Sequence, residues 1–207
     1  NAIEKSVAIG MSNLKFITSY NSTIPTCLIS ITVSTDGVPL SKSSAVNLWP
    51  ILVKVDQCIR VVPILVAVYS GETKPETITE FLTDFVNEMR FLEQDGVIVN
   101  GTLYFVNVSC VVADAPARAF VIGVKPHTAY HACERCQDDG NWNGRMCFST
   151  RPGLLLERFV SEMEELYGQT SIVYNVHSLL HVHQDALIYG SLDNVSAFPF
   201  ENYLQKI

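Results

Sequence analysis

The clearest pattern in the chain is a series of short apolar, β-branched runs, each closed by turn residues. Residues 27–35 (Cys-Leu-Ile-Ser-Ile-Thr-Val-Ser-Thr) predict a strand that stops at Asp36-Gly37. Similar runs at 48–55 and 61–69 predict two more strands, and we expect all three to form an antiparallel meander. A fourth strand is predicted over 103–113, and it delivers Asp114 at its end.

Helical periodicity follows the third strand. The best-defined helix begins near Pro75 and stops at Asp95-Gly96. Its apolar stripe at i, i+3, i+4 and i+7 consists of Ile78, Phe81, Leu82, Phe85, Val86, Met89 and Leu92. Ala115-Pro116 opens another helix, because proline suits the first helical turn. Further helices are predicted at 154–167, at 174–189, and from Pro199 onward.

Three strands, a helix and a fourth strand is the element order of the ribonuclease H-like fold. We therefore predict an α/β protein with a ribonuclease H-like mixed sheet flanked by helices. In that fold the first and fourth strands are neighbours at the centre of the sheet, so the acids that follow them meet. The expected divisions are a partial lead-in over 1–24, the sheet core with the first two acids over 25–125, a zinc-binding region over 126–190, and a C-terminal helix with a third acid over 191–207.

Composition limits the class of protein. A length of 207 residues suits one domain with at most a small appendage, and 48% hydrophobic with 17% charged residues permits a well-filled core. No apolar run reaches the roughly 18 residues of a membrane span, so we expect no membrane association. The net charge of −7 argues against tight DNA binding by this piece alone, because duplex affinity comes largely from Lys and Arg. The chain opens on Asn1 rather than Met, so we expect a trimmed chain and infer nothing from missing targeting signals.

Two distant clusters have the residue types and spacing of a split zinc site. Cys133 and Cys136 form a Cys-x-x-Cys turn, and His177 and His181 share one face if they lie on a helix. A redox-active thiol pair is the alternative, but such a pair usually opens a helix and here it follows one. For the histidines, the alternative is a polar stripe on an amphipathic helix, but four ligands of the right kinds favour structural zinc. His127 and His131 are competing ligands, whereas Cys27, Cys58, Cys110 and Cys147 are expected to be buried thiols.

Asp36, Asp114 and Glu201 are the candidate catalytic residues, because two-metal phosphoryl transfer needs carboxylates as ligands for Mg²⁺ or Mn²⁺. Each has an ordinary explanation: an Asp-Gly turn for Asp36, a helix N-cap for Asp114, and a first-turn carboxylate for Glu201. Their joint placement favours the catalytic interpretation, in which Asp36 bridges two ions and each of the others holds one.

Several segments together resemble the catalytic core of cut-and-paste DDE transposases of the CACTA/EnSpm type, in particular the animal branch. The resemblance also extends in plan to the catalytic subunit of the antigen-receptor recombinase. The segments are residues 35–44, 49–52, 69–75 and 114–120, the turn at 133–136, and residues 174–181 and 192–203. The resemblance implies that Asp36, Asp114 and Glu201 are the DDE triad and that Cys133, Cys136, His177 and His181 bind structural Zn²⁺. It also implies Mg²⁺-dependent DNA strand cleavage and transfer, transposon ends as the DNA partner, a homodimer, and a nuclear location.

One departure from the family pattern changes the expectation for activity. The family carries a long helical insertion between the Cys-x-x-Cys turn and the histidine motif, whereas only 40 residues separate Cys136 from His177 here. That insertion normally contacts DNA, so this chain is expected to be a poor transposase. The alternatives are a decayed or co-opted non-enzymatic remnant that serves as a zinc-stabilised binding scaffold, and a free-standing ribonuclease H-type nuclease.

Overall fold

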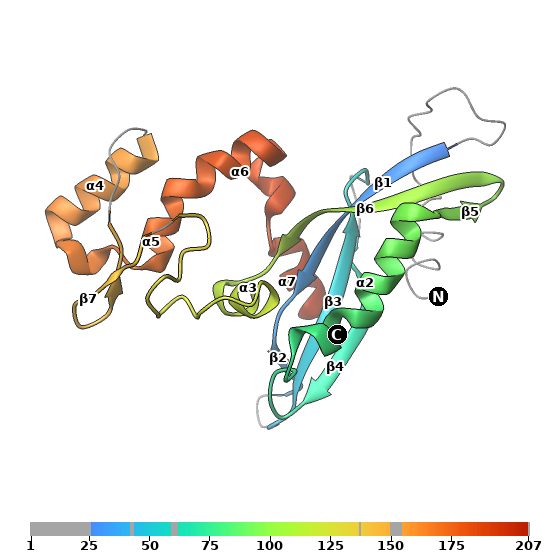
Figure 1. Cartoon of the computed structure of the whole chain (residues 1–207), viewed down its shortest axis with the longest axis horizontal. Helices are drawn as coiled ribbons and strands as arrows, with labels where there is room; N and C mark the ends of the chain where they lie inside the picture. Colours follow the sequence, from blue (N-terminus) through green and yellow to red (C-terminus); the bar gives the residue numbers. More distant parts are fainter. Residues whose placement is uncertain (1–25, 42–43, 59–61, 137, 150–154, 207) are drawn as a thin grey trace. The chain divides into compact units, whose positions relative to one another are not determined.

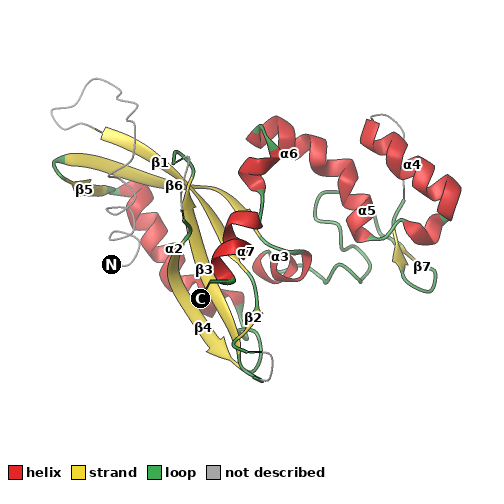
Figure 2. Ribbon diagram, turned by 180° about the vertical axis from the view of Figure 1, so that it is seen from behind, coloured by secondary structure: helices red, strands yellow, loops and turns green. Residues whose placement is uncertain are grey.

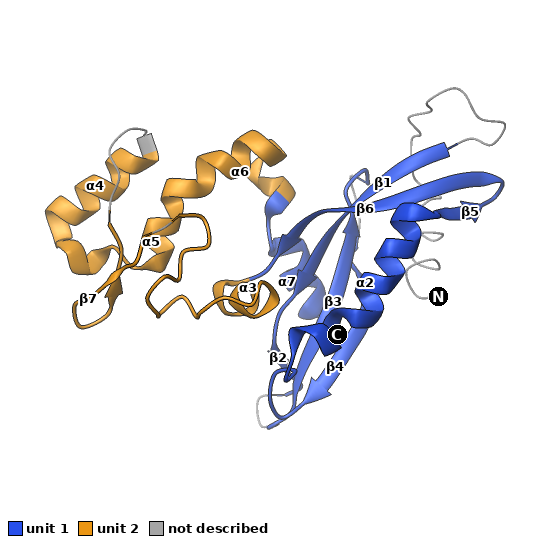
Figure 3. Cartoon of the chain, viewed as in Figure 1, with its two compact units in different colours: residues 1–113, 195–207 blue, residues 114–194 orange. Residues whose placement is uncertain are grey.

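The computed structural model describes residues 26–41, 44–58, 62–136, 138–149 and 155–206. Contacts divide the chain into two compact units (Figure 3). Unit 1 comprises Asn1–Ala113 with Val195–Ile207, and unit 2 comprises Asp114–Asn194. The predicted lead-in, residues 1–24, lies outside the described residues.

Unit 1 is built on a curled, mixed six-stranded sheet (Figure 1). Its strands are β1 (Thr26–Thr35), β2 (Val38–Pro39), β3 (Asn47–Val55), β4 (Ile64–Gly71), β5 (Val97–Val99) and β6 (Thr102–Val112). β1 lies in the centre, antiparallel to β3 on one side and parallel to β6 on the other. β2 and β4 both pair with β3, and β5 pairs with β6. The second half of β1 is buried at every position, as expected for a central strand covered on both faces.

Two helices cover opposite faces of this sheet. α2 (Ile78–Gln94) crosses the face turned toward the viewer in Figure 1, and α7 (Phe198–Leu204) lies against the other face, seen in Figure 2. Thr77 caps α2, since its hydroxyl accepts a hydrogen bond of 3.2 Å from the Glu80 backbone N–H. The α2 stripe packs into the main apolar core, where Leu92 is fully buried. α7 contributes Phe200, which is also buried.

Most of the predicted elements of unit 1 are present. The first, second and fourth predicted strands agree with β1, β3 and β6 to within a residue, and α2 follows the predicted stripe. The third predicted strand, 61–69, is observed as β4 over Ile64–Gly71, and position 61 lies outside the described residues. The short β2 and β5 were not predicted, because two or three residues carry too little periodicity.

Unit 2 is assembled from short helices and turns. It contains α3 (Ala115–Val121), β7 (Asn141–Trp142), β8 (Met146–Cys147), α4 (Leu155–Tyr167), α5 (Tyr174–Ser178) and α6 (Val182–Tyr189). Its small core includes Phe148, Val160 and Ile172. Residues 114–125, which the sequence groups with the sheet, group with unit 2 by contacts, and Ala115 packs against this core.

The predicted helix over 174–189 is interrupted. A 3₁₀ turn, Leu179–His181, separates α5 from α6. His177 therefore lies in α5, and His181 closes the 3₁₀ turn, so they do not share one regular helix as expected. Within the described residues, no helix has the length and apolar character needed to cross a membrane.

Candidate metal centre

The four predicted zinc ligands come together within unit 2. One donor atom from each of Cys133, Cys136, His177 and His181 lies within 4.8 Å of every other. Among the described residues, this is the only group of three or more His, Cys, Asp or Glu side chains close enough to hold an ion. The sequence thus identified a real spatial cluster from two motifs about 40 residues apart.

The donor atoms are arranged in two sulfur–nitrogen pairs. The distance from Cys136 Sγ to His177 Nε2 is 3.3 Å, and that from Cys133 Sγ to His181 Nε2 is 3.5 Å. Tetrahedral zinc with Zn–S of about 2.3 Å and Zn–N of about 2.0 Å separates sulfur from nitrogen by about 3.5 Å. These two sulfur–nitrogen distances are therefore compatible with a tetrahedral zinc site.

A second contact fixes the orientation of the His177 ring. Its Nδ1 lies 3.2 Å from the Ser149 carbonyl oxygen, which can only accept a hydrogen bond. Nδ1 therefore carries the proton, and in the neutral ring Nε2 presents its lone pair toward the sulfur atoms. Metal-binding histidines commonly donate their other N–H to a carbonyl in this way.

Asp138 holds the segment that supplies this carbonyl. Its carboxylate accepts hydrogen bonds from the Ser149 N–H at 2.7 Å, from the Ser149 hydroxyl, and from the Gly140 N–H at 3.0 Å. Burial acts to raise the pKa of Asp138, but these hydrogen bonds outweigh it and leave the pKa below its ordinary value. Asp138 is therefore an anionic anchor for the Ser149 backbone.

The cluster is closed to solvent on most sides. His177 is fully buried, and Cys133 and His181 are each 7% exposed. The Phe148 ring stacks on the His177 ring with centroids 5.0 Å apart. Cys136 is partly buried. A tetrahedral ion held by all four side chains would have no position left for a substrate, so the donor set suits a structural ion.

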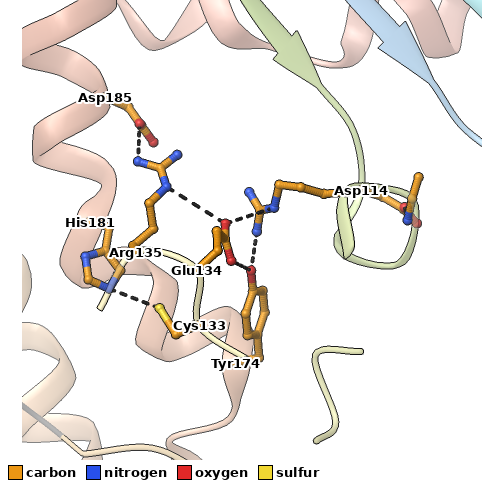
Figure 4. A network of polar contacts seen from close by, with 9 residues as sticks. Asp114, Cys133, Glu134, Arg135, Tyr174, His181 and Asp185 are labelled. Carbon is orange, nitrogen blue, oxygen red and sulfur yellow. Dashed lines mark hydrogen bonds and ion pairs between the residues drawn. The ribbon is translucent and has the colours of Figure 1, made fainter. Parts of the chain in front are cut away.

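The two residues between the cysteines join a polar network (Figure 4). Glu134 accepts from Arg118 Nε at 3.0 Å and from the Tyr174 hydroxyl at 2.8 Å, while Arg118 also donates to the Tyr174 oxygen. Arg135 donates to Asp185 at 2.6 Å. This network ties the Cys-x-x-Cys turn to α3, α5 and α6.

Burial and the contact with Glu134 together raise the pKa of Tyr174 to about 12. A nearby carboxylate and a partly dry setting both disfavour the phenolate. Tyr174 is therefore a neutral donor that helps to hold Glu134 in place.

The competing histidines take other roles. His131 is largely exposed and lies 2.9 Å from Asp139. His127 packs near the Tyr174 ring, and its Nδ1 is buried without a hydrogen-bond partner. Neither belongs to the four-residue cluster. Of the remaining cysteines, Cys27 and Cys147 are buried as expected, whereas Cys58 and Cys110 are only half-buried.

The three predicted catalytic acids lie on three different elements: after β1, at the start of α3 and in α7. Asp36 directly follows β1, and Glu201 lies exposed in the first turn of α7. Asp114 is the N-cap of α3: its Oδ1 accepts a 2.7 Å hydrogen bond from the Ala117 N–H. The ordinary explanation for Asp114 therefore applies, and its metal-binding role stays a prediction.

The sequence does not indicate that Arg118, Glu134 and Tyr174 interact. One sequence feature draws attention to Glu134: together with Arg135 it lies between the two cysteines of the Cys-x-x-Cys turn. Which cation and which hydroxyl contact Glu134 depends on how α3 and α5 pack.

Comparisons with protein-family models, with curated proteins and with solved structures find no match to this chain.

Proposed function

We propose that unit 2 binds one structural Zn²⁺ through Cys133, Cys136, His177 and His181. The observation that carries this proposal is the convergence of two thiols and two imidazoles within 4.8 Å of one another, with one ring oriented by the Ser149 carbonyl. Bound zinc would link the Cys-x-x-Cys turn to the α5 region and supply folding energy that the small core of unit 2 lacks.

Our proposal for the whole chain is a DDE-type core of transposase lineage that cuts and joins DNA strands. The arrangement of β1 and β6 supports it: the strands are parallel neighbours, and Ser34 pairs with Val112. Asp36 and Asp114 each lie two residues beyond this pair, so both follow the same end of the sheet. The antiparallel run β4–β3–β1 followed by parallel β6 is also the strand order expected of a ribonuclease H-like fold.

Asp36, Asp114 and Glu201 would hold divalent ions in this proposal. Carboxylates suit Mg²⁺ or Mn²⁺, which when bound would activate a water or 3′-hydroxyl and stabilise the leaving oxygen. Asp114 has a second carboxylate oxygen beyond the one that caps α3, so capping and metal binding are compatible. The DNA partner would be transposon ends, the site of action the nucleus, and the active form a homodimer.

A non-enzymatic scaffold is the second candidate. Two observations favour it: Asp114 already has a structural role as an N-cap, and the net charge is −7. An acidic surface repels DNA phosphates, and few Lys and Arg residues are present to offset this. Under this candidate the zinc centre and the sheet persist while catalysis is lost.

Replacing Asp114 by Asn separates the two candidates. Asn caps helices about as well as Asp, so Asp114→Asn should keep the fold, but an amide is a poor substitute for an anionic metal ligand. Nicking of plasmid DNA in Mn²⁺ at low salt would be measured, with Asp95→Asn at the exposed end of α2 as the matched control. The DDE proposal expects weak nicking by the wild type and the control, and none by Asp114→Asn. Absence of nicking by the zinc-loaded wild type, or equal nicking by both variants, would refute it.

A further inference from the structure

A groove runs between α2 and β4 in unit 1, far in sequence from the metal-binding residues. It has a volume of about 710 Å³. Its apolar lining includes Val66 and Val68 of β4 and Phe81 and Phe85 of α2. Val68 is 46% exposed, so the wall contributed by β4 is not closed over by the described residues.

The lining also includes a row of four carboxylates. Glu80, Asp84 and Glu88 recur every four residues along α2, and Glu76, which lies before the helix, precedes Glu80 by the same interval. Like charges four residues apart destabilise a helix slightly, so the carboxylate row lowers the stability of α2 in the free protein. Glu76, Glu80 and Asp84 make no ion pair with any described residue.

The strand beside this row has an open edge. Within the described residues β4 pairs only with β3, which leaves the backbone N–H and C=O groups of its other side without a strand partner. Proteins usually protect such an edge with a charge or a proline. The sequence of β4, Ile-Leu-Val-Ala-Val-Tyr-Ser-Gly, contains neither.

The spacing of the carboxylates matches an extended chain. Residues four apart on a helix are separated by about 6 Å along its axis, and residues two apart on a strand by about 6.6 Å. A peptide added to β4 would direct every second side chain toward the α2 side. We infer that this groove binds an extended peptide of a partner protein that carries Lys or Arg at every second position, added as a strand to β4.

The alternatives fit less well. Nucleic acid is repelled by the carboxylate row. A second copy of the chain paired edge to edge through β4 would bring two such rows onto the same face of a continuous sheet, and each copy carries a net charge of −7. A cationic strand neutralises the row and satisfies the open edge at once, which is the β-augmentation mode of peptide recognition.

The test is fluorescence anisotropy with the whole chain and a labelled alternating Lys-Val peptide of about eight residues, matched to the length of β4. Glu80→Gln/Asp84→Asn neutralises the centre of the row. Glu93→Gln/Glu165→Gln makes the same change in net charge at exposed positions that do not line the groove, and it is the matched control. A third arm uses the Lys-Val peptide with alternate backbone nitrogens methylated, which keeps its charge and removes donors.

We expect saturable binding of the Lys-Val peptide. At low salt its affinity should fall about five- to tenfold in Glu80→Gln/Asp84→Asn and stay unchanged in the control. Methylation of the peptide backbone should weaken binding further. Three results would overturn it: no binding of the Lys-Val peptide, equal binding by both double variants, or equal binding of the methylated peptide. Circular dichroism of each variant confirms that a lost signal does not reflect unfolding.

Discussion

The two units of this chain are stabilised by different means. Unit 1 buries long strands such as β1 and β6 under α2, and its core includes Ile31, Leu92 and Val106, which are fully buried. Unit 2 has short elements, two-residue strands and a small core into which Cys133 itself packs. Small regions that cannot bury enough apolar surface commonly depend on a metal or disulfide. If the Cys133/Cys136/His177/His181 cluster binds zinc as proposed, the ion would supply stability in unit 2 that unit 1 obtains by burying its sheet.

Removing the metal should produce the largest difference between the units. We expect chelation to unfold unit 2 and leave unit 1 folded, because structural zinc supplies roughly 10–16 kcal/mol in zinc-finger peptides. The two tryptophans report separately, since Trp49 belongs to unit 1 and Trp142 to unit 2. In a Trp142→Phe variant, Trp49 emission should stay unchanged on chelation while helical circular dichroism falls.

Cys133→Ser should mimic chelation and lower the zinc content measured by elemental analysis. Cys110→Ser is the matched control, because Cys110 is half-buried in unit 1 and serine can keep its contact with the Thr32 hydroxyl. Folded protein free of zinc, or equal loss in both variants, would contradict the structural role.

Leu92→Ala should show the reverse of metal removal: it should destabilise unit 1 and leave unit 2 unaffected. Leu92 is fully buried at the end of α2, and truncating such a side chain costs about 2–5 kcal/mol through lost burial and the cavity left behind. Ile98→Ala on β5 is the control, because Ile98 is 63% exposed. Denaturant unfolding followed by Trp49 fluorescence should show the loss, with zinc content unchanged. Loss of zinc in Leu92→Ala would show that the units do not fold separately.

Glu134→Gln should have a smaller effect, confined to unit 2. Glutamine keeps the size of the side chain but removes the charge that meets Arg118 and the Tyr174 hydroxyl. Charge-assisted hydrogen bonds contribute about 1.5–3 kcal/mol each, and partial solvent access reduces this, so we expect a loss of about 1–2 kcal/mol. Glu162→Gln removes an exposed ion pair with Arg158 in the same unit and should leave stability nearly unchanged, because solvent screens exposed charges. Thermal melts of the zinc-loaded proteins would compare the two.

The last prediction is a pH dependence of unit 2 stability that arises from Tyr174. Its pKa of about 12 in the folded protein lies above the ordinary value of 10.0, so the folded state favours the neutral phenol. This contribution is fully present below pH 10 and is lost as the pH rises from 10 toward 12. The stability difference between the wild type and Tyr174→Phe should therefore narrow over that range. A constant difference would show that Tyr174 does not titrate as its setting implies.

The sequence alone determined the elements whose signal is local and long. The β-branched runs specified β1, β3 and β6, and the seven-residue apolar stripe specified α2, because repeated side-chain periodicity reflects one buried face. The four members of the Cys/His cluster were also identifiable, because a Cys-x-x-Cys turn and two histidines four residues apart together supply the four donors of one tetrahedral site.

Tertiary structure decided what depends on contacts between distant segments. The helix predicted over 174–189 is divided by a 3₁₀ turn that contains His181. No local sequence pattern predicts this break. Residues 114–125 group with unit 2 by contacts, and Ala115 packs against the core of that unit. Arg118, Glu134 and Tyr174 meet only after α3, the Cys-x-x-Cys turn and α5 have packed, since a hydrogen bond depends on atoms brought within about 3 Å and not on sequence spacing.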